Sequence, residues 1–313
     1  MYFPYLRGKQ YELIALRELS QSLGENNVIH PVIEPVRDSV STLRLTIEQL
    51  KEDNATFTII INPKVGDFDS EHDQVIDIIN QYIGEYDDFQ IGVLIKPTSN
   101  LGHINSLLNY IEYNYSLNII HKGRFPEMNR LENFINEKNI AYNLFGDPTI
   151  IRRYRRIIDY STKVVLSDPF NTKPTNADYA KTPDEFFSDE HNFYEEDGFA
   201  GFADYVTIGD DYSDSGFAPY AVAIHLTYKK DDNGQIWIRH FVSDSNEDYT
   251  DVPGTYREAL NKLIEFINDN NIQSEACDEF RDHYNQSHYP GLGSVKKLSI
   301  KHHIELITNI LTR

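Results

Sequence analysis

The stretch that most constrains the fold reads Thr56-Phe57-Thr58-Ile59-Ile60-Ile61. It is apolar and rich in β-branched residues, without the strict alternation of a half-exposed strand, which indicates a strand covered on both faces. Strands of this kind lie inside parallel sheets, where crossover helices pack against the sheet. The rest of the sequence must therefore supply both neighbouring strands and the helices that cover them.

Seven further short apolar runs share this character. They are Tyr2–Leu6, Val28–Val36, Ile91–Ile95, Leu117–Ile120, Ala141–Phe145, Val164–Leu166 and Tyr205–Ile208. Segments with apolar residues at helical spacing lie between the runs, as in 75–83. Eight such units in about 200 residues predict a closed (β/α)8 TIM barrel. An open doubly wound sheet fits less well, because no Gly-rich phosphate turn follows the first run.

The same rhythm predicts a single barrel domain over residues 1–313, with three departures. Residues 171–203 form a long acidic connection before the eighth strand. Residues 219–243 resemble a β-hairpin inserted before the last barrel helix, with a tight turn at 231–234. The apolar face of the helix after Pro253 makes it the expected eighth barrel helix, and residues 272–313 are expected to form peripheral helices.

The charge is strongly acidic, with 29 Lys and Arg against 49 Asp and Glu and a formal net charge of −20. This balance opposes direct binding of nucleic acid or of an anionic membrane surface by the isolated chain. Eleven carboxylates lie between Thr182 and Tyr228, where there is no Lys or Arg. Part of the excess negative charge is therefore confined to this segment, and the net charge of −20 is compatible with an anion site elsewhere in the chain.

Cysteine content and hydropathy indicate the cellular compartment of the protein. The chain has one cysteine, Cys277, which excludes an intramolecular disulfide and a cysteine-rich zinc site. No segment approaches the roughly 18 consecutive apolar residues of a membrane span, and the first residues lack the pattern of a secretion signal. We therefore expect a cytoplasmic protein with no membrane association.

In a (β/α)8 barrel, ligands bind at the C-terminal ends of the strands, so the residues there are candidates for a site. The early strand ends are mostly basic, with Arg7, Lys9, Lys64 and Lys96, and the later ones acidic, with Asp147, Asp168 and Asp210. This division predicts a ligand that carries phosphate or carboxylate on one side. The alternative is that these charges form weak ion pairs around the rim.

Catalysis by the same residues is a further hypothesis. Glu34, Asp168, Asp210 and His121 would hold a divalent metal for hydrolysis of a phosphate ester, with Arg7, Lys64 and Lys96 on the phosphate. Oxygen ligands scattered over strands have no diagnostic spacing, so the metal, and whether the chain is an enzyme, stay open. The same strand ends are also compatible with a Schiff-base lysine at Lys64 or Lys96, or with a pair of carboxylates that hydrolyses a glycoside.

Three blocks of the sequence resemble the Beta protein-like family of phage and bacterial proteins. The first runs from Met1-Tyr2-Phe3-Pro4-Tyr5-Leu6-Arg7-Gly8-Lys9 to Leu16 and continues at His30-Pro31-Val32-Ile33-Glu34-Pro35. The others are Ala203–Asp210 and the segment from Pro219-Tyr220-Ala221 to Arg239-His240-Phe241, so the resemblance covers most of the chain.

Members of that family are often encoded near phage, mobile-element or defence genes. The resemblance therefore implies a component of a bacterial or phage conflict system, acting through a protein partner that a neighbouring gene encodes. It implies a barrel mouth that binds an anionic small molecule or peptide, and it supplies no catalytic residues. The polar positions in the matching blocks are Arg7, Lys9, Glu12, Glu34, Asp210, His225 and His240, and we expect any site to lie among them. His225 and His240 thereby join Arg7, Lys9, Lys64 and Lys96 as expected ligand-binding residues.

Overall fold

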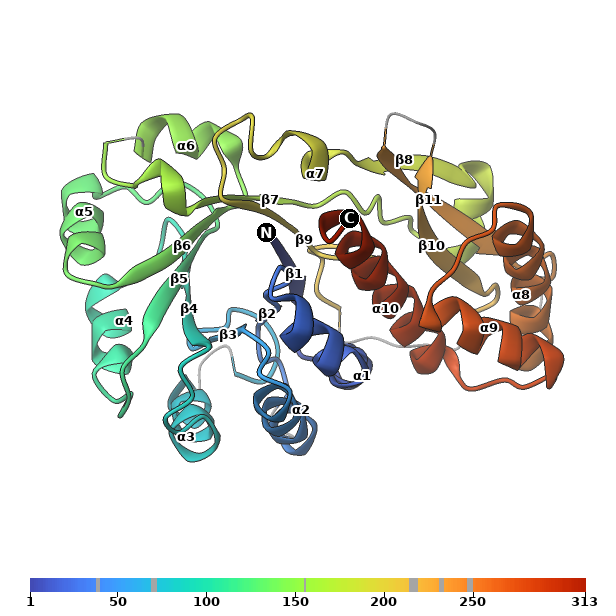
Figure 1. Cartoon of the computed structure of the whole chain (residues 1–313), viewed down its shortest axis with the longest axis horizontal. Helices are drawn as coiled ribbons and strands as arrows, with labels where there is room; N and C mark the ends of the chain where they lie inside the picture. Colours follow the sequence, from blue (N-terminus) through green and yellow to red (C-terminus); the bar gives the residue numbers. More distant parts are fainter. Residues whose placement is uncertain (38–39, 69–71, 155, 214–218, 231–233, 247–249) are drawn as a thin grey trace. The chain divides into compact units, whose positions relative to one another are not determined.

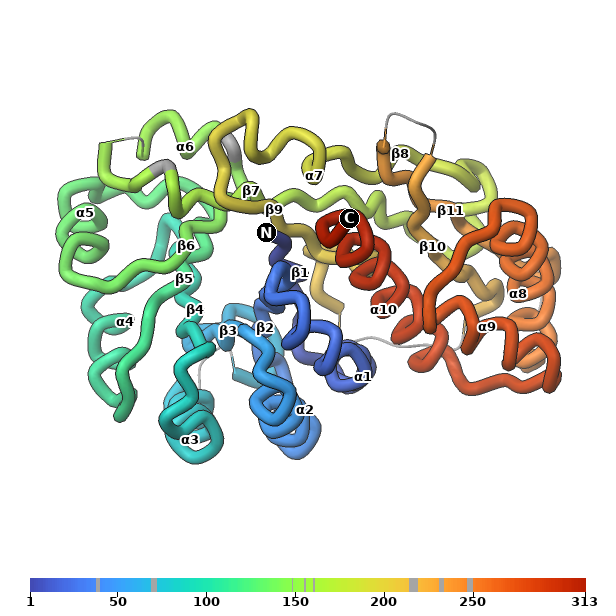
Figure 2. Tube along the Cα trace, in the orientation of Figure 1, coloured from blue at the N-terminus to red at the C-terminus, as the bar shows by residue number. Residues whose placement is uncertain are grey.

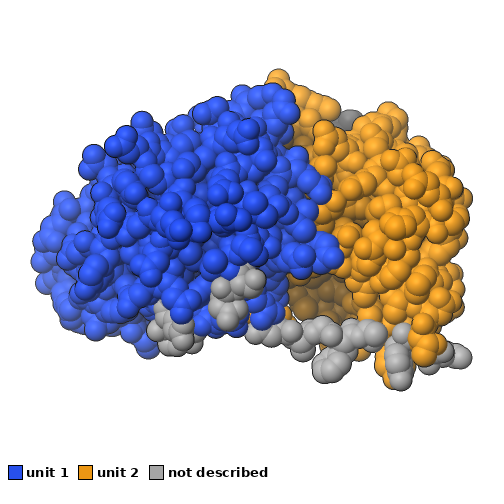
Figure 3. Space-filling view, turned by 90° about the horizontal axis from the view of Figure 1, so that it is seen from below, with its two compact units in different colours: residues 1–168, 190–205 blue, residues 169–189, 206–313 orange. Residues whose placement is uncertain are grey.

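The computed structural model describes residues 1–37, 40–68, 72–154, 156–213, 219–230, 234–246 and 250–313. Its chain divides into two compact units, coloured separately in Figure 3. Unit 1 comprises Met1–Asp168 and Glu190–Tyr205, and unit 2 comprises Pro169–Asp189 and Val206–Arg313. This differs from the single domain that we predicted over 1–313, because the chain leaves the barrel after its seventh strand and returns for the eighth.

Unit 1 is a closed barrel of eight parallel strands in the order β1-β2-β3-β4-β5-β6-β7-β9, which confirms the predicted (β/α)8 fold (Figure 1). The strands are β1 (Tyr2–Leu6), β2 (Val32–Ile33), β3 (Phe57–Ile60), β4 (Phe89–Ile95), β5 (Ser116–His121), β6 (Ile140–Phe145), β7 (Lys163–Ser167) and β9 (Gly201–Asp204). The helices are α1 (Gln10–Asn26), α2 (Ser41–Glu52), α3 (His72–Tyr82), α4 (Leu101–Leu108), α5 (Met128–Asn136), α6 (Pro148–Tyr154), η1 (Tyr160–Thr162) and α7 (Glu190–Phe193).

Alternate residues of the strands fill the interior of the barrel. This interior core consists of Phe3, Tyr5, Val32, Ile60, Leu94, Ile120, Leu144, Val164, Leu166, Ala203 and Tyr205. Side chains two positions apart on a strand point to the same face. The inward rows therefore continue into Arg7, Glu34, Lys96 and Lys122 at the C-terminal strand ends, which we call the mouth.

The eighth strand lies at Gly201–Asp204 and not at the predicted Tyr205–Ile208. It pairs with both β1 and β7, and the Phe202 amide donates to the Met1 carbonyl at 3.0 Å. A Cβ on Gly201 would lie 2.5 Å from that carbonyl oxygen, so closure of the barrel requires glycine there. The apolar run downstream was the wrong choice because the strand is defined by close approach to β1 and not by hydrophobicity.

A helical glycine, Gly24, marks the tightest contact between α1 and α2. A Cβ at this position would lie 1.8 Å from the Asp53 carbonyl oxygen, at the end of α2. Helix propensity alone favours Gly24→Ala by about 1 kcal/mol, but overpacking against backbone costs about 1–3 kcal/mol or more. We expect Gly24→Ala to lower the free energy of unfolding by about 2 kcal/mol in urea denaturation followed by circular dichroism. Glu25→Ala, exposed one residue on, is the control, and a stabilised Gly24→Ala would contradict this packing.

Unit 2 is built on a three-stranded antiparallel sheet with the order β10-β11-β8, whose trace can be followed in Figure 2. Its elements are η2 (Asn176–Lys181), β8 (Asp184–Ser188), β10 (Ala223–Lys230), β11 (Gln235–Val242), α8 (Val252–Asp269), α9 (Glu275–Asn285) and α10 (Leu292–Leu311). Strands β10 and β11 lie within residues 219–243, where we predicted a hairpin, and Gly234 has a φ of 72°. Positions 231–233 of the predicted turn lie outside the described residues. Strand β8 comes from the predicted acidic connection 171–203, so that segment is not merely a connection.

Helix α8 belongs to the core of unit 2 and is not the eighth barrel helix that we predicted. One face of the sheet, including Ile224, Leu226 and Phe241, packs against Leu260 and Leu263 of α8. Helices α9 and α10 complete this core with Ala276, Cys277, Phe280, Val295 and Leu298, so residues 272–313 are an integral part of unit 2 and not peripheral helices. Among the described residues, no helix combines the length and the apolar composition that crossing a bilayer requires.

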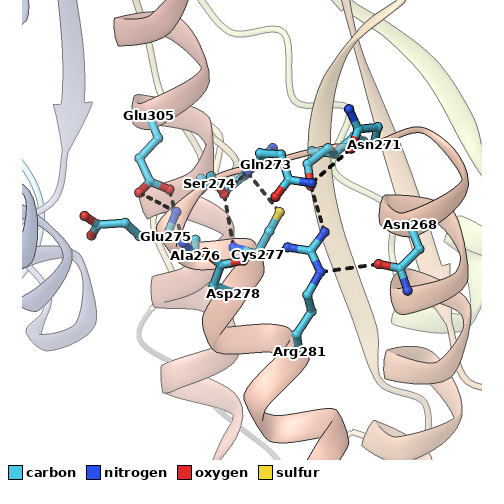
Figure 4. A network of polar contacts seen from close by, with 12 residues as sticks. Asn268, Asn271, Gln273, Ser274, Glu275, Ala276, Cys277, Asp278, Arg281 and Glu305 are labelled. Atoms are coloured by element: carbon cyan, nitrogen blue, oxygen red, sulfur yellow. Dashed lines mark hydrogen bonds and ion pairs between the residues drawn. The ribbon is translucent and has the colours of Figure 1, made fainter.

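Polar contacts hold the start of α9 against α10 (Figure 4). The Ser274 hydroxyl accepts a hydrogen bond from the Cys277 amide at 3.0 Å, as an N-cap does. Glu305 of α10 accepts from the amides of Glu275 and Ala276 at 3.1 and 3.3 Å. Burial raises the pKa of the Cys277 thiol to about 11, so this cysteine is a protonated core residue.

Candidate functional site at the barrel mouth

A buried ion pair lies at the centre of the mouth. The Arg7 guanidinium donates to Oε2 of Glu34, and both side chains are less than a tenth exposed. The Tyr5 hydroxyl donates to the same oxygen at 2.7 Å, and the Lys64 backbone amide donates to Oε1 at 2.9 Å. Both carboxylate oxygens of Glu34 are therefore engaged, by groups from β1 and from the loop after β3.

The turn after β1 fixes the position of Arg7. Gly8 has a φ of 62°, and a Cβ there would lie 3.0 Å from the Glu34 carbonyl oxygen. Glu12, buried in the first turn of α1, accepts from the Arg7 backbone amide at 2.6 Å. Lys9 is the N-cap residue of α1 and is half-buried. Of these two polar positions of the matching blocks, Glu12 thus orients the Arg7 backbone and Lys9 precedes the first turn of α1.

Two tyrosines underlie the basic groups of the mouth. The rings of Tyr5 and Tyr205 lie 4.8 Å apart between centroids. The Arg7 guanidinium is 5.3 and 5.6 Å from these two rings, and the Lys122 ammonium is 5.5 and 4.3 Å from them. Lys122 also donates to the Tyr205 hydroxyl. Cations within about 6 Å of a ring face are attracted to it, so the tyrosine pair holds two positive charges together at the mouth.

Tyr5, Tyr205 and Lys122 were not in the predicted set of site residues. Their inward orientation follows from the alternation of side chains along β1, β5 and β9. The position of Tyr205, however, depends on a strand that the sequence did not locate. Lys122 had a usable signal, since it lies two residues after the inward Ile120.

The predicted lysines Lys64 and Lys96 have different surroundings. The Lys64 ammonium lies 3.4 Å from Nε2 of His72 at the start of α3, and Nδ1 of His72 lies 3.2 Å from Nε2 of His103 in α4. Lys96 follows the inward Leu94 by two residues and is half-buried. Within the described part of the chain its ammonium forms no ion pair. Lys64 therefore contributes its backbone to Glu34, while Lys96 keeps an available charge.

His121 does not belong to the mouth, contrary to the hydrolase hypothesis. It is fully buried on the outer face of β5, where its ring stacks on Phe145 at 4.6 Å and contacts Tyr154 of α6. Its Nε2 lies 3.0 Å from Oδ1 of Asn143, and burial lowers its pKa to about 4. The neighbouring Ile120 faces the barrel interior, so alternation turns His121 toward the helices.

The other predicted metal ligands do not all belong to one unit. Asp168 directly follows β7 in unit 1 and is exposed, while Asp210 is part of unit 2. Glu34 already accepts hydrogen bonds at both oxygens. Among the described residues, no group of three His, Cys, Asp or Glu side chains is arranged to hold a metal ion. The residues proposed for a divalent metal therefore do not fit one within unit 1.

His225 and His240 lie on the sheet of unit 2 and not at the barrel strand ends. They are paired across β10 and β11, and their Nδ1 atoms lie 2.7 Å apart. The sequence grouped them with Arg7, Lys9, Lys64 and Lys96 as ligand-binding positions, but the two histidines belong to unit 2 and the other four residues to unit 1.

A scan against family models found no match to this chain, and no curated protein matched it. Among solved structures, the chain is similar to two crystal forms of N-acetylneuraminate lyase from Mycoplasma synoviae. Form II has a TM-score of 0.40 and 10% identity over 66% of this chain and 69% of that one. Form I has a TM-score of 0.39 and 12% identity over 66% of this chain and 67% of that one.

Proposed function

We propose that unit 1 binds an anionic small molecule or the carboxylate of a peptide at its barrel mouth. The observation that carries this proposal is the placement of two cations, Arg7 and Lys122, by the rings of Tyr5 and Tyr205. Lys96 joins them by alternation, because it follows the inward Leu94 by two residues. The buried carboxylate of Glu34 accepts from Arg7, Tyr5 and the Lys64 amide. Lys96 forms no ion pair among the described residues, so its charge can complement an incoming carboxylate or phosphate.

Local electrostatics support an anion here despite the acidic total. Lys96 has no ion-pair partner among the described residues. The Lys122 ammonium donates to the Tyr205 hydroxyl and lies within 5.5 Å of the Tyr5 and Tyr205 ring centroids. An anion that contacts both lysines would reduce the repulsion between like charges at the ends of the adjacent strands β4 and β5. Short-range contacts of this kind outweigh distant carboxylates, whose effect is screened beyond about 8–10 Å in physiological salt.

We further propose that the protein acts through a protein partner encoded by a neighbouring gene, as a component of a bacterial or phage conflict system. The residue blocks that resemble the Beta protein-like family support this role. Recovery of a product of a neighbouring gene in a pull-down with the full chain is the expected result. Failure to recover any such partner, together with turnover of a phosphate ester by the isolated protein, would overturn it.

The alternative, metal-assisted hydrolysis of a phosphate ester, requires Glu34, Asp168, Asp210 and His121 to converge. His121 faces the helices, and Glu34 is engaged by a guanidinium, a hydroxyl and an amide. No observation in unit 1 favours this alternative over binding.

Replacement of Lys96 by alanine tests the binding site directly. Calorimetric titrations with inorganic phosphate and, separately, with succinate distinguish the two anion classes. We expect Lys96→Ala to weaken whichever anion binds by about tenfold or more, because a hydrogen bond to a charged group contributes about 1.5–3 kcal/mol. Thermal stability should be unchanged, since Lys96 has no ion pair among the described residues.

Lys138→Ala is the matched control, because it removes the same charge just before β6, at the opposite end of the strands. The proposed site would be wrong if neither anion bound the unmodified protein. It would also be wrong if Lys138→Ala weakened binding as much as Lys96→Ala.

A further inference from the structure

Unit 2 contains a chain of three side chains that ends at a cavity. On the sheet, His240 Nε2 lies 3.2 Å from Oε2 of Glu185 in β8, and His240 Nδ1 lies 2.7 Å from His225 Nδ1. Glu185 also accepts from Lys173 at 2.9 Å and from Asn171 at 3.1 Å. The contacts thus run from Glu185 to His240 and then to His225, and hydrogen bonds from Lys173 and Asn171 fix the Glu185 carboxylate.

The hydrogen bonds determine which nitrogen of each ring carries the proton. Burial raises the pKa of Glu185, but hydrogen bonds from Lys173 and His240 lower it more, so the carboxylate is ionised and can only accept. His240 must therefore donate from Nε2. Burial lowers the pKa of His240, so its ring is neutral and its Nδ1 is an acceptor. His225 must then donate from Nδ1, which leaves a lone pair on its Nε2.

His225 lines a cavity of about 230 Å³ within unit 2. Phe170, Tyr179, Val222, Leu292 and Val295 form apolar walls of the cavity, and the polar residues Asn176, Lys296 and Ser299 also line it. Rings of Phe170 and Tyr179 pack against the His225 ring at 5.1 and 4.6 Å and restrict its rotation. Because drug-sized ligands fill cavities of about 300–1,000 Å³, this smaller one suits a single-ring molecule.

A second polar group lines the same cavity. Thr207 is 4% exposed, and its hydroxyl Oγ1 is buried without a hydrogen-bond partner in the described part of the chain. A buried hydroxyl with no partner costs about 1–3 kcal/mol, so such groups are normally satisfied by protein, water or ligand. The lining of the cavity therefore contains both a hydroxyl without a hydrogen-bond partner, on Thr207, and an acceptor nitrogen with a fixed tautomer, on His225.

We propose that this cavity is a second small-molecule site, for a compact single-ring ligand whose hydroxyl group donates a hydrogen bond to His225 Nε2. The apolar walls pack against the ring of the ligand, and the Thr207 hydroxyl bonds to the same ligand oxygen. Glu185 and His240 act as positioning residues, because they fix the tautomer that makes His225 an acceptor. This site lies in unit 2 and is independent of the anion site proposed for the barrel mouth.

Phenol and fluorobenzene test the proposal, since they have similar shapes but only phenol can donate a hydrogen bond. Calorimetry on the full chain should show that phenol binds at least about tenfold more tightly than fluorobenzene, as expected of a site built around a hydroxyl contact. His225→Phe, which keeps a ring, and Thr207→Val, which keeps the shape, should remove this preference. His288→Phe, the same change at an exposed position of unit 2, should retain it, and so should Lys96→Ala.

The tautomer can be measured independently by nitrogen-15 NMR of the imidazole rings. We expect His225 to be protonated at Nδ1 and His240 at Nε2. The His225 pattern should persist at pH 5, because burial holds the pKa of His225 at about 3. Protonation of His225 at Nε2, equal affinity for phenol and fluorobenzene, or no binding of phenol would each overturn the proposal.

Discussion

Replacement of Glu34 by alanine is expected to lower the free energy of unfolding of unit 1 by about 3–5 kcal/mol, because it leaves the Arg7 guanidinium buried without its carboxylate. The Tyr5 hydroxyl and the Lys64 amide lose their acceptor in the same change. Few single substitutions have so large an effect, and it would approach the total stability of a marginal domain. Urea denaturation followed by far-ultraviolet circular dichroism measures it.

Three variants separate the causes of this loss. Glu34→Gln keeps the shape and one acceptor oxygen, so we expect a smaller loss of about 1–3 kcal/mol. The double variant Arg7→Met with Glu34→Leu removes both charges and should recover much of the stability, since apolar replacements of buried pairs are often neutral. Glu52→Ala, an exposed carboxylate of α2, is the control for a lost charge. A loss below about 1 kcal/mol in Glu34→Ala would show that the pair does not anchor the mouth.

The residues of the mouth therefore have two kinds of role. Arg7 and Glu34 are a structural pair that ties β1 to β2 and to the loop after β3. Lys96 and Lys122 continue the inward rows and carry the charge that the proposed anion would use. A substitution at Glu34 would disturb ligand binding through the fold, whereas one at Lys96 should act on binding alone. That difference is why Lys96, and not Glu34, is the test of the anion site.

The barrel could be predicted from the sequence because most of its strands are short apolar runs with helices between them. The eighth strand could not, because Gly201 and Asp204 are poor strand formers that are needed for specific contacts. Gly201 admits the Met1 carbonyl, and Asp204 accepts from the buried Tyr2 hydroxyl at 2.7 Å. Strand β8 was not predicted for a related reason, since its carboxylates, Asp184 and Glu185, made the segment resemble an acidic loop. Asp184 accepts from the Tyr228 hydroxyl and the Lys230 ammonium within the sheet.

The candidate site was predictable only where strand ends could be located to the residue. Arg7 was found because its strand ends clearly at Leu6, whereas Glu34 lay inside the predicted run Val28–Val36 and was chosen for its charge; their mutual pairing was not foreseen. His121 was misplaced because a shift of one residue moves a side chain from the interior to the helix layer. His225 and His240 were recognised as polar positions, but their pairing depends on strand register in a sheet that the sequence did not fully show.

Acidification should destabilise both units, because several histidines are buried in neutral form. Burial lowers the pKa of His30 and His121 in unit 1 and of His302 in unit 2, each from 6.5 to about 4. In His302, burial outweighs the hydrogen bond that Nε2 donates to the Thr227 carbonyl at 2.8 Å, which alone would raise the pKa. Below pH 6.5 these histidines bind protons in the unfolded chain, but in the folded chain they stay neutral until about pH 4. Stability is therefore full above pH 6.5 and is lost as the pH falls toward 4.

One pKa unit corresponds to about 1.4 kcal/mol, so each of these histidines should reduce stability by about 2 kcal/mol between pH 7 and pH 5. Urea denaturation at the two pH values measures this loss, with the fluorescence of Trp237, the single tryptophan, reporting on unit 2 and circular dichroism on both units. His121→Phe should lower the free energy of unfolding at pH 7. It should also reduce the loss of that free energy in unit 1 between pH 7 and pH 5 by about 2 kcal/mol, because the phenyl ring cannot bind a proton. His288→Phe, at an exposed position, should change neither value. Equal stability at pH 7 and pH 5 would contradict the neutral burial of these rings.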